Sequence, residues 1–170
     1  NFCHYLAGLL LATLIVITVF SQVTSNTGSD PRGTLLVSQV IVQHGTIKLD
    51  SYEKEFLGTF AHQIHQKNGH TYNYFPLGTS VLSTPFVAIA NAMGYDMIRD
   101  EANTQLILTA LAALFITIIL YKTARLYLKR IESLLLAGLC WFGSSLASTV
   151  GTALWSHDFA FLFSSTAIFL

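Results

Sequence analysis

The sequence has 170 residues, of which 52% are apolar and 11% are charged, and its mean hydropathy is +0.55. Soluble domains carry about 25% charged residues, so this composition excludes an ordinary soluble domain and indicates a membrane protein. The net charge is zero, which gives no indication of nucleic-acid binding, and Cys3 and Cys140 have neither disulfide-framework nor metal-ligand spacing.

The first apolar run, roughly Tyr5 to Val23, contains no charged residue and is rich in leucine, isoleucine and valine. A secretory signal peptide is the alternative interpretation. However, the run is longer than the usual apolar region of about 7–15 residues, and no A-x-A-like cleavage site follows it. We therefore expect residues 1–23 to form a retained transmembrane helix.

The next segment, residues 24–101, has the pattern of a polar and amphipathic loop. Asp30 as N-cap, Pro31 in the first turn and Gly45 after the last turn are typical helix punctuation. The apolar residues between them recur at helical spacing, which predicts an amphipathic helix lying on membrane lipid at the interface. Asp50 to Glu53 has the pattern of a capping box and predicts a second short helix.

Asn68-Gly69 is the preferred pair for a type I′ turn and predicts a small hairpin over roughly Gln63 to Tyr74. A two-residue loop also fixes the register of the two strands. The expected cross-strand pairs are Lys67 with His70 and His65 with Tyr72. The alternative is that the preceding helix continues to Gln66.

A short apolar stretch, Thr79 to Met93, follows the chain break at Phe75 to Gly78 and ends at Gly94. About 20 apolar residues are needed to cross a membrane, so this stretch is short for a span, and it contains Pro85. We expect a re-entrant or interfacial helix here, with a short kinked transmembrane helix as the alternative.

Asn103 is placed to cap a long helix that runs to Leu128, with its apolar part from Leu106 to Leu120. Four of the nine lysines and arginines lie at its exit, and by the positive-inside rule this turn is cytoplasmic. The residues at this exit are Lys122, Arg125, Lys129 and Arg130. The loop 24–101, with seven acidic and five basic residues, is then on the non-cytoplasmic side.

A third span is expected from Ser133 to Leu154. Within it, Gly143, Ala147 and Gly151 recur four residues apart, and small residues at this spacing let another transmembrane helix approach closely. Other transmembrane helices are therefore expected partners of this face. The chain then reaches the non-cytoplasmic side again at Asp158.

The predicted fold is an all-α polytopic membrane protein with about three full transmembrane helices, the start of a fourth, and interfacial helices in the first outer loop. Its divisions are the first span (1–23), the outer loop (24–101) and the later spans (102–170). Residue 1 is not methionine, and the apolar run after Asp158 is too short to cross the membrane. We therefore expect the N-terminal fragment of a larger protein.

Two carboxylates, Asp30 and Asp158, are the main candidates for chemistry because both are expected at the outer membrane face beside a span. A carboxylate there can act as general base toward a hydroxyl or amine, or can hold a cation. The alternative for each is that it only caps the helix it begins. Their predicted placement on the same face would let the two side chains converge on one site.

His62, His65 and His70 lie in the outer loop without a carboxylate that completes a metal set, so we expect surface histidines rather than a metal site. Arg32, beside Asp30, is the strongest candidate for contact with a phosphate at the interface. No P-loop, G-x-S-x-G, H-E-x-x-H or paired-cysteine motif occurs, so soluble nucleotide chemistry is not indicated.

This layout resembles the N-terminal part of the GT-C membrane glycosyltransferases, of the protein mannosyltransferase and aminoarabinose transferase kind. An acidic residue follows the first span, and the interfacial helix ends in His-Gly (Ser38 to Gly45). A Gly-His-Thr-Tyr-Asn-Tyr-Phe-Pro-Leu-Gly turn follows (Gly69 to Gly78), then a short apolar helix, a long span with a basic exit, and an acidic residue that opens a later helix. The resemblance covers essentially the whole chain.

The resemblance implies retaining or inverting transfer of a sugar from a polyprenyl-phosphate donor at the outer face of a bacterial plasma membrane. It maps one acidic residue near the acceptor onto Asp30 and a second onto Asp158. Arg32, His157 and Tyr74 are the expected substrate-binding residues, with Arg32 at the donor phosphate. A divalent cation near Asp30 is the one cofactor that these residues suggest.

One departure from the family pattern concerns Pro31, because many members carry a second acid at that place. A mechanism that needs two adjacent carboxylates is therefore not expected here. The competing hypothesis is a non-catalytic small membrane subunit. It would pack through Gly143, Ala147 and Gly151 against a larger membrane complex.

Overall fold

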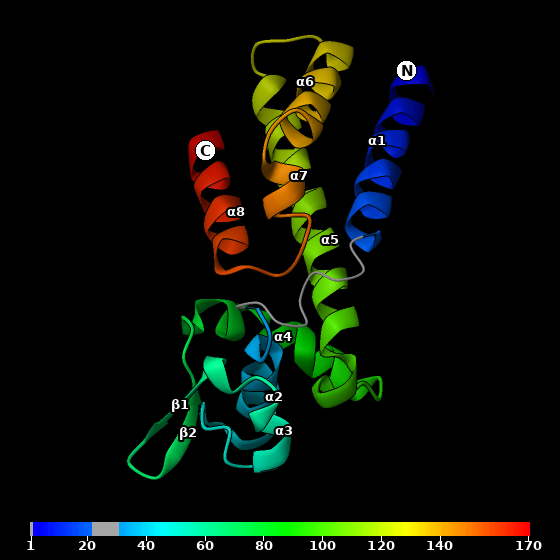
Figure 1. Cartoon of the computed structure of the whole chain (residues 1–170). Helices are drawn as coiled ribbons and strands as arrows, with labels where there is room; N and C mark the ends of the chain where they lie inside the picture. The colour runs from blue at the N-terminus through cyan, green and yellow to red at the C-terminus, as the bar shows by residue number, and fades with distance from the viewer. Residues whose placement is uncertain (1, 22–30) are drawn as a thin grey trace. The chain divides into compact units, whose positions relative to one another are not determined.

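The computed structural model describes residues 2–21 and 31–170 and is mostly helical (Figure 1). The chain divides into two compact units. The first, called here the helical unit, comprises Asn1–Thr24 and Leu106–Leu170, and the second, the loop unit, comprises Ser25–Gln105.

The helical unit contains one long apolar helix and all but the first turns of another. Among the described residues, two helices are long and apolar enough to cross a membrane, α1 (Phe2–Phe20) and α5 (Met97–Ala124). Many of their large apolar side chains are exposed, as is typical of a surface that faces something other than water. The unit is completed by α6 (Arg130–Phe142), α7 (Leu146–Thr149) and α8 (Ser156–Phe169).

The core of the helical unit is built around Trp141 of α6, which is fully buried. It belongs to one cluster with Ile15 and Val19 of α1 and Ala113 and Ile116 of α5. An indole buries a large apolar area and therefore dominates the packing of such a core. Ala113 is small and leaves room on α5 for neighbouring side chains, so three helices share one hydrophobic core.

The third span predicted from Ser133 to Leu154 is not confirmed, because the structure does not form one continuous helix there. α6 ends at Phe142, Gly143 follows with φ −93° and ψ 0°, and α7 then forms only 4 residues. A helix of 13 residues is shorter than the roughly 20 needed to cross a bilayer. Because no single helix carries Gly143, Ala147 and Gly151, they do not form the predicted continuous small-residue face.

We expect Gly151→Ala to destabilise the helical unit by about 1–3 kcal/mol. A Cβ at Gly151 would lie 2.3 Å from the carbonyl oxygen of Ala147, so the backbone would have to move. Gly8→Ala is the control, because a Cβ there meets no atom within 4 Å and alanine favours the helix. Thermal unfolding of the full-length protein in detergent measures the difference. If Gly151→Ala unfolds no earlier than Gly8→Ala, the glycine is not required at this turn.

The loop unit is organised around α2 (Thr34–His44), which packs against α4 (Leu77–Ala92). The first seven residues of α2 are all buried. The hydroxyl of Ser38 donates a hydrogen bond of 2.7 Å to the carbonyl oxygen of Ser80 in α4. The prediction of an amphipathic helix with one apolar face is therefore wrong over this stretch, because polar residues of α2 are covered as well.

The first turn of α2 depends on Gly33. This residue is the N-cap, with φ 84°, and a Cβ there would lie 2.9 Å from the side-chain nitrogen of Asn73. The predicted helix start at Pro31 is wrong because α2 begins three residues later, at Thr34. Asp30, the predicted N-cap, lies outside the described residues. Gly45 ends α2 in the left-handed conformation, as predicted.

The predicted hairpin is confirmed in position and register. β1 (Ile64–Lys67) and β2 (His70–Asn73) are antiparallel, and Lys67 pairs with His70 and His65 with Tyr72. Both turn residues have positive φ, 53° at Asn68 and 78° at Gly69, as a type I′ turn requires. The elements before the hairpin are α3 (Lys54–Gly58) and the 3₁₀ helix η1 (Ala61–Gln63).

A side chain of α2 fixes the beginning of α5. The amide oxygen of Gln39 accepts the backbone N–H of Met97 at 2.7 Å, and its amide nitrogen donates to the carboxylate of Asp96 at 3.0 Å. The predicted cap at Asn103 is therefore wrong, because that residue lies inside α5. α4 ends just before Gly94, whose φ is 89°, in agreement with the predicted end of that helix.

Candidate functional site

Arg32, the predicted phosphate ligand, lies at the start of the described part of the loop unit. Its guanidinium carbon is 5.0 Å from the centre of the Phe60 ring, and one of its nitrogens donates to the hydroxyl of Thr59 at 3.0 Å. A guanidinium over an aromatic face is held by the ring quadrupole. These contacts position the charge two residues after Asp30, which lies outside the described residues.

A further carboxylate, that of Glu101 in α5, lies beside this segment. Its Oε1 accepts the backbone N–H of Leu35 at 3.1 Å and the side-chain amide of Gln105 at 3.3 Å. The same amide donates to the carbonyl oxygen of Pro31 at 2.8 Å. Because the first N–H groups of a helix lack internal partners, Glu101 serves as the missing cap of α2. It thereby positions the backbone that follows Asp30.

Asp158, in the first turn of α8, is fully buried. Its Oδ2 accepts the backbone N–H of Trp155 at 2.9 Å, which closes the start of the helix. Within the part of the chain that the structure describes, its Oδ1 is buried and has no hydrogen-bond partner. A buried carboxylate oxygen needs a donor or a cation to offset its lost hydration. Asp158 therefore both caps a helix and presents an unsatisfied acceptor.

His157 lies beside Asp158 but in a different environment. Its ring is exposed and stacks on the indole of Trp155, with the ring centres 5.7 Å apart and an angle of 12° between the planes. The indole N–H donates to the hydroxyl of Thr152 at 3.1 Å, which fixes the platform on which the imidazole rests. The imidazole is thus an exposed ring that rests on a partly buried indole.

Tyr74 directly follows β2 and is 70% exposed. Its backbone N–H donates to the carbonyl oxygen of Gln63 at 2.7 Å, and its ring meets Phe75 edge-on. It lines a surface hollow of about 380 Å³ together with His65 and Lys67. Tyr74 and Arg32 thus lie in the loop unit, whereas His157 and Asp158 lie in the helical unit, and their convergence with Asp30 stays a prediction.

The histidines of the outer loop differ in their surroundings. Among the described residues, no group of three or more His, Cys, Asp or Glu side chains comes together to hold a metal ion. His70 has a specific partner, because its Nδ1 lies 2.6 Å from the carboxylate of Asp50. Its Nε2 lies 3.1 Å from the ammonium of Lys48. An ammonium can only donate, so Nε2 accepts and the Nδ1–H donates to Asp50.

The predicted capping box at Asp50 is wrong. α3 begins at Lys54 with Glu53 as N-cap, and Asp50 instead accepts the backbone N–H of Thr71 at 2.7 Å. This hydrogen bond, followed by the one from His70, holds the pKa of the Asp50 carboxyl below its usual value. The carboxylate thus ties the chain before α3 to the second strand of the hairpin.

We expect this contact to make the stability of the loop unit depend on pH. A depressed carboxyl pKa stabilises the fold above the unfolded-state value, near 3.8, and the contribution is lost as the pH falls through the folded-state value. Thermal unfolding of wild type and Asp50→Asn between pH 7 and pH 3 measures this contribution to stability. The variant should be less stable at pH 7, and the difference should shrink below pH 4. If wild type and Asp50→Asn differ in stability by the same amount at every pH, this linkage is contradicted. Glu55→Gln serves as a control on an exposed carboxylate.

Comparisons with known protein families, with curated proteins and with solved structures find no match. The chemistry must therefore be inferred from the side chains themselves. Of the predicted site residues, Asp158 has the environment with the clearest chemical consequence. Glu101 was missed, and the available signal was an acid one turn before the apolar part of α5.

Proposed function

We propose that the chain is part of a GT-C-type membrane glycosyltransferase. It transfers a sugar from a polyprenyl-phosphate-linked donor to an acceptor on the non-cytoplasmic side of a bacterial plasma membrane. The proposal is supported by the order of motifs that resembles this family and by two helices apolar enough to span a membrane. The basic exit of α5, at Lys122 and Arg125, supports the assignment of sides.

The observation that carries the proposal is the buried carboxylate of Asp158, whose Oδ1 has no partner within the described residues. Such an oxygen can accept a substrate hydroxyl or hold a cation that neutralises the donor phosphate. Asp30 is the proposed base. It takes the proton of the acceptor hydroxyl as that oxygen bonds to the anomeric carbon, and the polyprenyl phosphate leaves with the electrons of the broken bond.

Arg32 is proposed to bind the phosphate of the donor. A guanidinium can offer two parallel N–H groups to phosphate oxygens, which favours arginine at such sites. Its contacts with Phe60 and Thr59 hold the charge in place before the donor arrives. His157 and Tyr74, both with exposed rings, are proposed to contact sugar or acceptor.

Sugar transfer by the full-length protein from a polyprenyl-phosphate donor tests the proposal. We expect Asp30→Asn to lower the rate by roughly 10²–10⁴, the usual contribution of a general base. Glu55→Gln, which changes an exposed carboxylate in α3, should leave the rate unchanged. Full activity of Asp30→Asn would remove Asp30 from the mechanism. Absence of transfer by the wild type with any polyprenyl-phosphate sugar would favour the non-catalytic subunit.

A further inference from the structure

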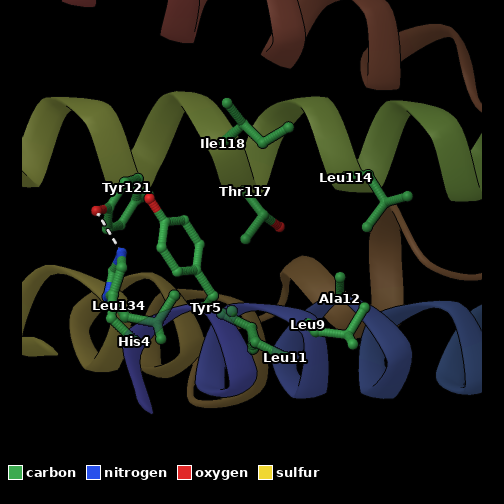
Figure 2. A pocket seen from close by; sticks show the side chains of 11 residues that line it. His4, Tyr5, Leu9, Leu11, Ala12, Leu114, Thr117, Ile118, Tyr121 and Leu134 are labelled. Carbon is green, nitrogen blue, oxygen red and sulfur yellow. Dashed lines mark hydrogen bonds between the residues drawn. The ribbon is translucent and has the colours of Figure 1, made fainter. Parts of the chain in front are cut away.

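A groove between α1 and α5 in the helical unit is not used by the proposed function. It has a volume of about 490 Å³, within the range of about 300–1,000 Å³ typical of small-molecule sites. Its walls are mostly apolar, and Gly8 leaves space on the α1 side because an added Cβ would meet no atom within 4 Å. Figure 2 shows Leu9 and Ala12 of α1 facing Leu114 of α5 toward one end.

The other end of the groove is polar. The hydroxyl of Tyr121 lies 3.1 Å from Nε2 of His4, and Figure 2 shows this pair at the end opposite Leu114. Within the described residues, Nδ1 of His4 is buried and has no hydrogen-bond partner. A ligand that fits both ends therefore has a long apolar part and a polar part near His4.

The α5 wall continues into the basic turn. Leu114, Thr117 and Tyr121 line the groove at helical spacing, and Arg125 is one turn further along the same face. The helical geometry holds at this point, since the backbone N–H of Arg125 donates to the carbonyl oxygen of Tyr121 at 2.9 Å. Lys122 adds a second, exposed cation beside Tyr121. The two cations thus lie beyond the polar end of the groove rather than in its lining, and the Arg125 guanidinium donates to the carbonyl oxygen of Leu128.

We propose that this groove binds one acyl chain of an anionic glycerophospholipid of the cytoplasmic leaflet, with the lipid phosphate at Arg125 and Lys122. Basic residues at the cytoplasmic end of a transmembrane helix attract anionic headgroups. The sugar donor is a different lipid, because its chemistry is assigned to the opposite membrane face. The site does not require sugar transfer, but it rests on the assignment of sides made in the proposed function, and it would stabilise the pairing of α1 with α5.

The test uses the full-length protein in phosphatidylcholine vesicles that contain a trace of phosphatidylglycerol with a photoreactive diazirine on its acyl chain. After illumination, peptide mapping should place the label on the groove faces of α1 and α5. Unlabelled phosphatidylglycerol should compete roughly tenfold or more better than phosphatidylcholine, as two engaged basic side chains imply. Equal competition by the two lipids, or stronger competition by polyprenyl phosphate, would overturn the proposal.

Two variants separate the apolar part of the site from its charged part. Gly8→Phe fills the groove and should abolish the label, whereas Gly8→Ala should keep it. Arg125→Gln should keep the label but reduce the preference for phosphatidylglycerol severalfold, and it tests the site even if Gly8→Phe fails to fold. Labelling that survives Gly8→Phe would refute the lipid site, and so would an Arg125→Gln variant with an unchanged preference for phosphatidylglycerol.

Discussion

Replacing Asp158 by asparagine is expected to lower sugar transfer by roughly 10²–10³ while the protein stays folded. Asparagine keeps a side-chain oxygen that can accept the backbone N–H of Trp155, so the start of α8 is retained. It cannot carry the negative charge that a cation or a developing positive charge requires. Replacement by alanine should lose the activity and also destabilise the helical unit by about 1–3 kcal/mol, because the Trp155 N–H then lacks its partner.

The control for Asp158 is Glu132, which has the same local geometry in an exposed position. Oε2 of Glu132 accepts the backbone N–H of Lys129 at 3.1 Å at the start of α6. Glu132→Gln should leave both the transfer rate and the unfolding temperature almost unchanged. Transfer rates and thermal unfolding of Asp158→Asn, Asp158→Ala and Glu132→Gln distinguish a role in sugar transfer from a role in stability. Asp158→Asn with full activity would show that Asp158 only caps α8.

The features predicted correctly from sequence are those that neighbouring residues determine. The hairpin register follows from two residues, Asn68 and Gly69, because the type I′ turn needs positive φ at both positions. The end of α2 likewise follows from Gly45, which takes the left-handed conformation. No distant contact has to be known for either prediction.

The predicted third span is not confirmed as one helix, because hydropathy does not record where a helix breaks. Residues 133–154 are apolar enough to form a span, but the chain leaves the helix at Gly143 and turns again near Gly151. Added Cβ atoms there would meet backbone oxygens at 2.6 and 2.3 Å. Small residues at four-residue spacing, here Gly143, Ala147 and Gly151, are also the pattern of helix contact, so the sequence alone favoured a continuous helix.

The candidate site was predicted in part. An acid that opens α8 was recognisable at Asp158, but the burial of its carboxylate depends on tertiary packing and was not. Glu101 was missed for a related reason, because the N–H that it accepts belongs to Leu35, 66 residues earlier in the chain. A helix cap supplied by a distant element leaves no local pattern in the sequence.

Removing the Glu101 side chain is expected to have the largest effect on the loop unit. Glu101→Ala leaves the Leu35 N–H and the Gln105 amide without this acceptor at the N-terminus of α2. Together these changes should lower stability by about 2–4 kcal/mol. Hydrogen exchange at the Leu35 amide should accelerate strongly, because α2 would open from its first turn.

Glu101→Gln and Glu55→Ala complete this experiment. Glutamine keeps an oxygen that can accept the Leu35 N–H, so Glu101→Gln should lose less stability than Glu101→Ala. Glu55 is exposed on α3, and its replacement should change stability by less than about 0.5 kcal/mol. Unfolding curves measure the stability of each variant, and hydrogen-exchange rates at the Leu35 amide report how readily the first turn of α2 opens. If Glu101→Ala behaves like Glu55→Ala, the carboxylate does not hold the first turn of α2, and the backbone after Asp30 is positioned by other contacts.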